Sequence, residues 1–566
     1  MPLFPSDRFV RFVEMTDLLH AAAATHPDLM EISTIGSSFE DRPILLCTLT
    51  NAATGPHDEK PALWVDANIH ATELTGSAAA LHLIERLLEG YDTDETITRA
   101  LDTRTFYVVP RVSPDGAELA MAEKPRWVRS SARAWPLTDQ QPGLVGQDID
   151  GDGRILTMRI EDPNGAWKKS AADARLLVGR DPTEVDHAQY YRLLTEGLIE
   201  EYDGVQMPNA PALAAIDMNR NYPVEWRPAG GQAGAGDYPA SEPEIRAVVQ
   251  GLIDRPNVCA FIQYHTYSGV HLRPYADKAD DKMPTFDLWM YQEIGKKATE
   301  MTGYPAVGVH KDFRYDPKDV ITGVGNDWAY DHRGVHAWVT EFWNPKKAAG
   351  VDDLRFIEWA GDHPFDDDLK MLAYADESVP GGGFVDWYPF DHPQLGHIEI
   401  GGFDTAGWIR NPPLSVLAEE IAPHADWAIW HALISPLLGV RDVVVERSGD
   451  TTWRIRLVVE NTGYLPTQVT QRAIERKIVR PVEAEILLDP GATLVKLVGG
   501  RRKQQLGQLA GRARKTSMFN GFGAPSDGTP DRGVAEWVVE AAVGTRLDLV
   551  ARHDRAGTVR TQVTLG

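Results

Sequence analysis

Strand-length runs recur along the first three quarters of the chain, and helical patterns stand between several of them. They read ALWVDANI (62–69), TFYVVPRV (105–112), VCAFIQYH (258–265), HAWVTEFW (336–343) and HIEIGGF (397–403). Nearly continuous apolar runs are typical of strands buried on both faces, because a strand with one exposed face shows strict alternation instead. Such strands alternating with helices predict an α/β sandwich around a largely buried sheet.

The texture changes after Gly439. Short segments of alternating polarity follow, separated by Gly, Asn and Asp turns, and this pattern predicts a β-sandwich, with an immunoglobulin-like architecture as the nearest type. A chain of 566 residues is also too long for one core. We therefore expect a catalytic domain at 1–438, interrupted by a long polar insert at about 141–205, and an accessory domain at 439–566.

Charge, cysteine content and apolar runs narrow the binding partners and the cellular location that we expect. The 57 basic and 82 acidic side chains give a net charge of −25, which argues against non-specific nucleic-acid binding. Cys47 and Cys259 lie in apolar runs and are expected to be buried thiols, with a disulfide as the minor alternative. We find no signal peptide and no membrane-spanning run, so we expect a cytoplasmic protein with no membrane partner.

Histidines end two of the apolar runs. His70 follows the first run and precedes Glu73 by three residues, and His265 ends the run 258–265. Neighbouring strand ends can bring two imidazoles and a carboxylate to one ion, and zinc accepts these ligands. Glu341 sits among aromatic residues in a third run, where burial raises the pKa of a carboxyl group. It therefore suits a general base acting on metal-bound water.

The segment 217–223, DMNRNYP, combines an amide, a guanidinium and a carboxylate. An arginine fork beside an asparagine can clamp a substrate carboxylate, so Asn219 and Arg220 are candidate substrate-binding residues.

Six segments together resemble the zinc metallocarboxypeptidases of the carboxypeptidase A type. They are HATE (70–73), PRVSPDGAE (110–118), DMNRNYP (217–223), HTYSGVHLRPY (265–275), GNDW (325–328) and AWVTEF (337–342). The resemblance spans roughly residues 7–438. It implies an α/β/α sandwich with a mixed sheet of about eight strands. It also implies one zinc ion and hydrolysis of the peptide bond next to a free C-terminal carboxylate.

The resemblance also implies residue roles. His70, Glu73 and His265 would hold the zinc, and Glu341 would activate the zinc-bound water and pass its proton to the leaving amine. Asn219 and Arg220 would bind the terminal carboxylate.

Four further positions belong to the comparison with this family; the first matches the family's pattern and the other three match it less closely. Asp217 would orient a ligand histidine. Arg129 would stabilise the oxyanion, with Arg126 as the alternative. Tyr315 is the nearest candidate for the tyrosine that caps the substrate, and Thr72 stands where an arginine is often found.

The insert carries half of a calcium loop. Asp148, Asp150 and Asp152 stand at the first, third and fifth positions, but Arg159 replaces the acid at the twelfth. The sequence leaves two interpretations open. The segment could bind Ca²⁺, or it could be an Asp-rich turn whose carboxylates accept hydrogen bonds from the backbone. The insert could also border the mouth of the active site.

Three functions compete. The first is a metallocarboxypeptidase whose partner is a peptide with a free C-terminal carboxylate. The second is a zinc amidohydrolase or deacylase acting on a carboxylate-bearing non-standard amide, such as a γ-linked or cell-wall peptide. The third is a non-catalytic binding protein that contains zinc. Glu341 argues against the third, because a closed structural zinc site needs no base.

Overall fold

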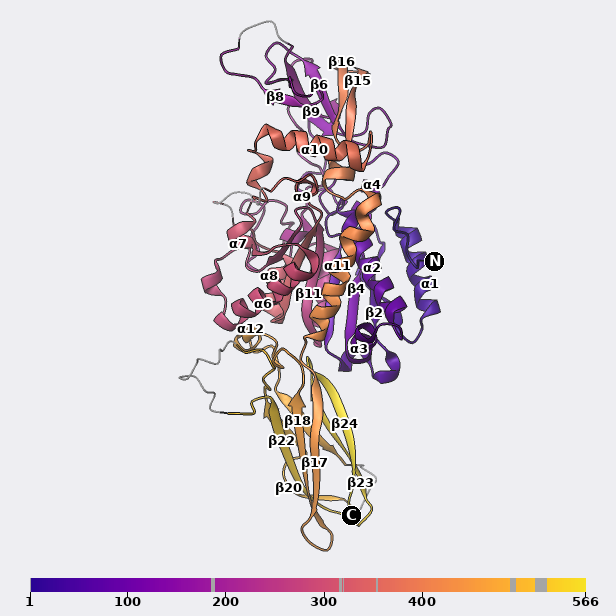
Figure 1. Ribbon diagram of the computed structural model, residues 1–566, viewed down its shortest axis with the longest axis vertical. Helices are drawn as coiled ribbons and strands as arrows, with labels where there is room; N and C mark the ends of the chain where they lie inside the picture. The colour runs from indigo at the N-terminus through magenta and orange to yellow at the C-terminus, as the bar shows by residue number, and fades with distance from the viewer. Residues whose placement is uncertain are drawn as a thin grey trace.

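The computed structural model describes residues 2–184, 189–314, 318, 320–352, 355–488, 495–514 and 527–566. Three parts follow one another along the long axis: a sheet with helix α10 beside it, a central α/β part, and a pair of antiparallel sheets (Figure 1). No helix in the described ranges is both long enough and apolar enough to cross a bilayer.

The central part is built on a mixed sheet of eight strands. Their order is β1-β2-β4-β3-β11-β14-β12-β13. Strands β4, β3, β11 and β14 run parallel, while β1, β2 and β12 supply antiparallel pairs. The bounds are β1 (Met30–Ser37), β2 (Pro43–Leu49), β3 (Ala62–Ala67), β4 (Thr105–Val109), β11 (Val258–Thr266), β12 (Val270–Arg273), β13 (Ala306–Gly308) and β14 (His336–Phe342).

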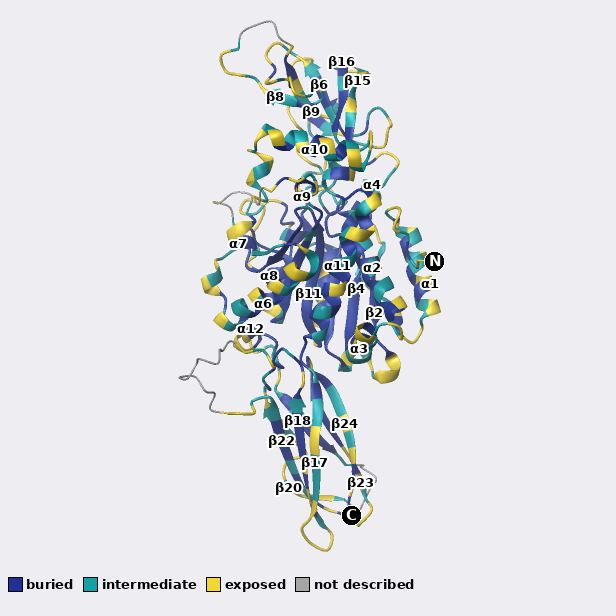
Figure 2. Cartoon of the chain, viewed as in Figure 1, coloured by how far each residue is buried: buried dark blue, intermediate teal, exposed yellow. Residues whose placement is uncertain are grey.

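Helices cover both faces of this sheet, and its middle strands are buried along their whole length (Figure 2). The predicted α/β/α sandwich is therefore confirmed. The helices of this part are α1 (Phe12–Thr25), α2 (Leu74–Gly90), α3 (Glu95–Thr103), α4 (Pro114–Ala120), α5 (Pro243–Ile253), α6 (Thr285–Thr302), α7 (Val309–Asp312), α8 (Gly325–Arg333), α9 (Pro345–Ala348) and α11 (Leu414–Leu433).

The sheet beyond the central part has six strands in the order β15-β16-β6-β9-β7-β8. Its members are β6 (Thr157–Glu161), β7 (Trp167–Lys169), β8 (Leu177–Gly179), β9 (Tyr191–Thr195), β15 (Phe384–His392) and β16 (Gly396–Phe403), with α10 (Phe365–Ser378) beside them and the pair β5 (Gly143–Gly146) and β10 (Gly197–Glu200) nearby. Interpreting 397–403 as part of the main α/β pattern was wrong, because β16 pairs with β6 of the insert.

The C-terminal part consists of two four-stranded antiparallel sheets, β17-β18-β22-β20 and β21-β19-β23-β24. Their inward side chains form one apolar core, to which Trp453 and Trp537 contribute from the first sheet and Leu549 from the second. The predicted all-β sandwich is confirmed. Whether residues 439–566 fold alone as a domain stays a prediction. The strands are β17 (Leu438–Arg447), β18 (Thr452–Asn461), β19 (Val482–Leu487), β20 (Lys496–Gly499), β21 (Lys503–Gly507), β22 (Arg532–Glu540), β23 (Arg546–His553) and β24 (Gly557–Thr564).

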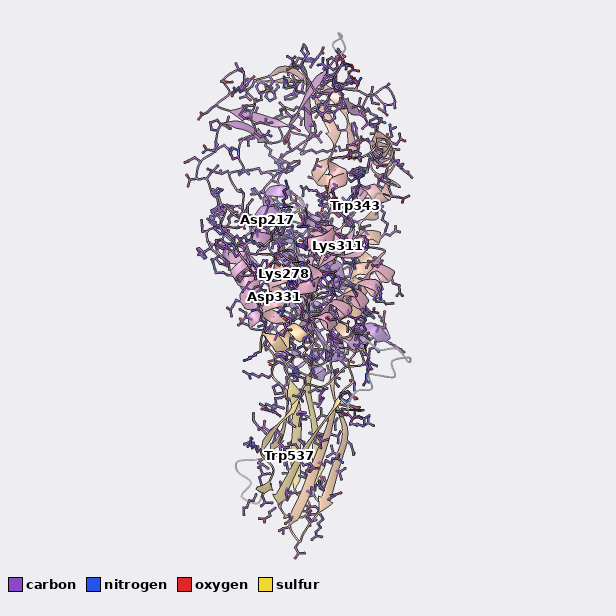
Figure 3. All side chains as sticks on the ribbon, turned by 90° about the vertical axis from the view of Figure 1, so that its left-hand side faces the viewer. Asp217, Lys278, Lys311, Asp331, Trp343 and Trp537 are labelled. Carbon is purple, nitrogen blue, oxygen red and sulfur yellow. The ribbon has the colours of Figure 1, made fainter. Side chains whose placement is uncertain are left out.

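Buried charges tie this sandwich to helix α8. Asp331 of α8 lies on the side of the central part that faces Trp537, whereas Asp217 lies towards the opposite end (Figure 3). The guanidinium of Arg555 is buried and donates hydrogen bonds to the carbonyl oxygens of Gly334 and Gln468, each at 2.8 Å, and to that of Arg333.

Replacing Arg555 with methionine is expected to lower the free energy of unfolding by about 3 kcal/mol, because three buried carbonyls lose their donor while the side-chain volume is kept. Urea unfolding followed by circular dichroism measures the change. Arg560 is the matched control, since it forms an exposed ion pair with Glu59 across the same junction and its replacement should cost under about 1 kcal/mol. Equal losses for both variants would contradict the prediction.

Candidate metal centre and active site

The site lies at the carboxyl ends of three neighbouring strands. The loop after β3 carries His70 and Glu73, β11 carries His265, and β14 carries Glu341. Asn68 holds the first loop in shape, because its side-chain amide donates to the carbonyl oxygen of His70 at 2.7 Å. Helix α2 begins directly after Glu73.

Close packing of α2 on β11 brings the two ligand-bearing segments together. Gly76 makes this possible, since a Cβ there would come within 2.8 Å of the carbonyl oxygen of Tyr264. His70 and His265 lie 195 positions apart in the chain. Their predicted approach thus depends on Gly76 in the first turn of α2.

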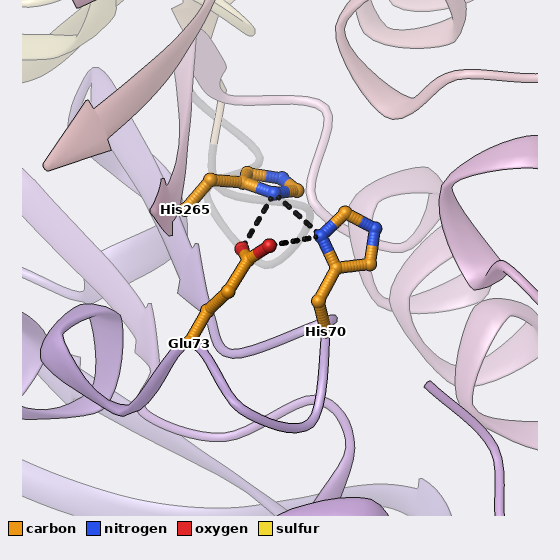
Figure 4. A group of neighbouring side chains, drawn as sticks. All are labelled: His70, Glu73 and His265. Carbon is orange, nitrogen blue, oxygen red and sulfur yellow. Dashed lines mark hydrogen bonds and ion pairs between the residues drawn. The ribbon is translucent and has the colours of Figure 1, made fainter. Parts of the chain in front are cut away.

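The side chains of His70, Glu73 and His265 point at one another (Figure 4). The Nδ1 atom of His70 lies 2.8 Å from Oε1 of Glu73, and the Nδ1 atom of His265 lies 3.1 Å from both Nδ1 of His70 and Oε2 of Glu73. Ligands of a tetrahedral zinc ion with bonds of about 2.0 Å stand about 3.3 Å apart. Two imidazole nitrogens and a carboxylate at these separations fit zinc.

The remaining nitrogen of each imidazole has a fixed partner. His70 Nε2 lies 3.1 Å from Oδ1 of Asp217, and His265 Nε2 lies 3.0 Å from Oε1 of Gln263. Each acceptor favours a proton on Nε2, which leaves Nδ1 free as a metal ligand. Burial lowers the pKa of His265 to about 4, so its ring is neutral near pH 7.

Glu73 is held in an ionised state. Burial alone would raise the pKa of its carboxyl group, but the neighbouring histidines hold the pKa well below its usual range. The backbone N–H of Thr266 donates to Oε2 at 3.1 Å, and the guanidinium of Arg129 donates to Oε1 at 3.2 Å. The carboxylate is therefore fixed in position from two sides.

Glu341 is placed differently. It lines the same pocket, and its carboxylate accepts no hydrogen bond from any of the described residues. Burial and the negative charge of Glu73 raise its pKa well above the usual range. A carboxyl group that is exposed to the pocket and not held by hydrogen bonds can exchange a proton with a bound molecule.

Three polar side chains complete the arrangement. Arg129 is bonded to Asp217 through Nε, at 3.2 Å, and also to Glu73, whereas Arg126 is exposed. The side-chain oxygen of Asn219 accepts from the backbone N–H of Gly325 at 2.9 Å. Its amide nitrogen donates no hydrogen bond to any of the described residues. Arg220 is anchored by a 2.7 Å hydrogen bond to the carbonyl oxygen of Asn219.

Five of the side chains described above line a cavity of about 400 Å³: Glu73, Arg129, Asp217, Arg220 and Glu341. Its other walls are partly apolar and come from Thr266, Tyr267, Ser268, Phe313, Phe356, Ile357, Ala360 and Arg410. Tyr315, the predicted capping tyrosine, lies outside the described residues. The lining includes no residue of 141–205, so the prediction that this insert borders the mouth receives no support within the described part of the chain.

The predicted calcium trio is not a metal-fitting group in the described part of the chain, because Asp148 and Asp150 group with Glu196 and not with Asp152. The carboxylate of Asp148 accepts from the backbone N–H groups of Gly151 and Gly153, at 2.6 and 2.9 Å. Asp150 and Asp152 accept in the same way from residues two positions ahead. These contacts form an Asp-rich turn, the alternative interpretation of the motif.

Sequence reasoning missed Gln263 and Arg410. Gln263 was detectable, because it lies two residues before His265 and therefore on the same face of β11. Arg410 belongs to no recognisable motif, and only the three-dimensional path of the chain brings it to the pocket.

Comparison with known proteins finds a family match over more than half of the chain. A family profile described as zinc carboxypeptidase matches residues 15–352, and one described as a domain of unknown function matches residues 437–564. Carboxypeptidase A2 of Rattus norvegicus is 25% identical over 326 residues, which cover 56% of this chain and 58% of that protein. Carboxypeptidase A1 of Sus scrofa is 23% identical over 273 residues, covering 47% and 46%. The chain thus spans about half the length of the curated relatives it matches. Among solved structures, thrombin activatable fibrinolysis inhibitor aligns with a TM-score of 0.39 and 18% identity, covering 66% of this chain and 75% of that one.

Proposed function

The chain belongs to the zinc carboxypeptidase family, and from this premise we propose that it is a zinc-dependent enzyme that removes the C-terminal residue of peptides. One observation carries the proposal. Glu73 of the metal-fitting trio lines one cavity together with Arg129, Arg220 and Glu341, and no described residue donates a hydrogen bond to the Glu341 carboxylate. A closed structural metal site would need neither the free carboxyl group nor the cavity.

The Nδ1 atoms of His70 and His265 and the carboxylate of Glu73 would hold the ion. Bound zinc supplies Lewis-acid polarisation of the substrate carbonyl and of a water molecule. Asp217 and Gln263 keep the two imidazoles in the tautomer and orientation that this requires.

Glu341 serves as the base and then as the acid. Its carboxylate takes a proton from the attacking water and returns that proton to the nitrogen of the leaving amine. Its raised pKa helps the carboxyl group to hold the proton between these two transfers. Because no described residue donates a hydrogen bond to it, both oxygens stay available to the substrate.

The two arginines have separate tasks. Arg129, positioned by Asp217 and Glu73, would donate to the oxygen that gains negative charge, and loss of such a donor typically lowers kcat by about 10²–10³-fold. Arg220 and the free amide of Asn219 would bind the terminal carboxylate of the substrate, which fixes the last peptide bond over the metal.

The test is release of single C-terminal amino acids from a mixed peptide library, abolished by a zinc chelator and restored by added Zn²⁺. Blocking the C-terminus as an amide is expected to lower kcat/KM by at least about 10²-fold, because Arg220 and Asn219 lose their anionic partner. Cleavage of acyl amides without peptide hydrolysis, or equal rates for free and amidated peptides, would contradict the proposal.

A further inference from the structure

Residues 404–411 connect β16 of the six-stranded sheet to α11 and reach the active-site cavity on the way. They lie beyond the segment 15–352 that the family profile matches. A π-helical turn, Thr405–Ile409, occupies most of this connection, and the side chain of Asp404 accepts from the backbone N–H of Gly407 at 2.8 Å.

The connection is fixed at both of its sides. The side-chain oxygen of Asn411 accepts from the backbone N–H and the hydroxyl of Thr75, at 3.0 and 2.8 Å, and its amide nitrogen donates to the carbonyl oxygen of Thr72 at 2.9 Å. The indole N–H of Trp343 donates to the carbonyl oxygen of Trp408 at 2.8 Å. The segment is thus bound to the loop that carries Glu73 and to the end of β14.

Arg410 is placed by these anchors on the wall of the cavity. It is half-buried, and its guanidinium forms no hydrogen bond or ion pair within the described ranges of the chain. It lies close enough to Glu341 to act electrostatically on that carboxylate, as Arg129 and Arg220 also do.

The other two arginines of the cavity have protein partners. Arg129 is paired with Glu73 and Asp217, each at 3.2 Å, and Arg220 is bonded to a carbonyl oxygen and lies 3.9 Å from Asp217. Arg410 therefore differs in two ways: its sequence neighbours Trp408 and Asn411 are anchored, and no described residue pairs with its guanidinium, which leaves its charge for a bound molecule. A guanidinium in this setting selects carboxylates.

We propose that Arg410 binds a second carboxylate of the substrate, on the acyl side of the scissile bond, so that the enzyme prefers peptides with an acidic penultimate residue. The inference rests on the proposed function, which assigns the terminal carboxylate to Arg220. Arg410 adjoins the loop of Thr72 and Thr75, whereas Arg220 and Asn219 adjoin Gly325. Separate elements therefore carry the two anion sites.

The charges of the cavity agree with a doubly anionic substrate. Three guanidinium groups line the cavity with the carboxyl groups of Glu73, Asp217 and Glu341. With Glu341 ionised, as its role as a base requires, these charges cancel and a divalent ion adds two positive charges. One terminal carboxylate leaves an excess of one positive charge, and a second carboxylate removes it.

The experiment compares blocked peptides that end in Glu-Leu, Gln-Leu, Leu-Glu and Leu-Gln, with the zinc-loaded full chain. We expect kcat/KM for the Glu-Leu peptide to exceed that for the Gln-Leu peptide by about tenfold or more. Arg410→Gln should abolish this preference by slowing only the Glu-Leu peptide, and Arg410→Lys should keep part of it. Arg441→Gln, at an exposed arginine of β17 outside the cavity lining, is the control and should change neither rate.

Two results would overturn the inference. One is that Arg410→Gln slows hydrolysis of the Glu-Leu and Gln-Leu peptides equally. The other is a preference set by the last residue, with kcat/KM higher for the Leu-Glu peptide than for the Leu-Gln peptide. If no peptide is hydrolysed at all, the proposed function fails, and calorimetry of the Glu-Leu and Gln-Leu peptides still tests Arg410. If the Glu-Leu peptide binds more tightly than the Gln-Leu peptide and Arg410→Gln removes the difference, Arg410 binds the second carboxylate. Equal binding of the two peptides overturns the inference.

Discussion

Replacing Glu341 with glutamine is expected to lower kcat by about 10³-fold while the protein keeps its zinc. The amide has nearly the same shape but cannot take a proton from water or return one to the leaving amine. No described residue donates a hydrogen bond to this carboxylate, so the substitution leaves no buried partner without its bond. Release of amino acids gives kcat, and elemental analysis gives the zinc content.

Two variants make this result specific. Glu358→Gln changes an exposed carboxylate on a neighbouring surface and should leave kcat unchanged. Asp217→Asn should weaken zinc binding, because His70 Nε2 loses its anionic acceptor. Retention of more than about a tenth of kcat by Glu341→Gln would remove this residue from the chemistry. Loss of zinc from the same variant would make it a metal-site residue instead.

The candidate metal centre could be predicted because its members stand where a short local pattern places them. His70 lies in the loop directly after buried β3, and His265 is the last residue but one of buried β11. The carboxyl ends of such strands lie at one edge of a parallel sheet. Glu73 follows His70 by three residues, which is enough for both to face the same point. In each case the position of the ligand residue is set by the end of a strand, and the pattern of apolar residues in the sequence shows where a strand ends.

The other wall of the cavity could not be predicted, because long-range pairing places it. Strand β16 pairs with β6, whose residues precede it by about 240 positions in the chain (Glu399 with Arg159). The connection after β16 then brings Arg410 to the cavity. The run 397–403 predicts a strand but not its neighbours, because either sheet could have accepted it.

The aspartate motif shows a different limit. Carboxylates spaced two residues apart with glycines between them can coordinate Ca²⁺ or accept hydrogen bonds from their own turn. In the structure, Asp148 and Asp150 bond the backbone N–H groups of Gly151 and Asp152. The spacing is the same for both outcomes, so the local sequence alone could not decide between them.

The strongest effect on stability is expected from two buried histidines far from the cavity. His336 of β14 and His431 of α11 are fully buried, and neither ring nitrogen of either residue has a hydrogen-bond partner among the described residues. Burial lowers the pKa of His431 to about 4 and holds that of His336 well below its usual range, with the charge of His431 and of Arg555 adding to the shift.

The sign of the pH dependence follows from these directions. The unfolded chain binds protons at both histidines below about pH 6.5, whereas the folded protein does not until the pH approaches the lowered values. The free energy of unfolding therefore has its full value, as far as these two histidines are concerned, above pH 6.5. It decreases as the pH falls towards 4. At pH 5 the loss is about 2 kcal/mol for each histidine, or about 4 kcal/mol for the pair.

The double variant His336→Phe/His431→Leu is therefore expected to be more stable than the parent at pH 5 by about 4 kcal/mol beyond any difference at pH 7.5. Buried carboxyl groups with raised pKa values, such as those of Asp66 and Asp327, act in the opposite direction. They are the same in both proteins and cancel in the comparison. His397→Leu, at a side chain that is 73% exposed, is the surface variant with which the double variant is compared. Urea unfolding at the two pH values measures the effect, and a stability difference that is the same at both would show that these histidines do not titrate on unfolding.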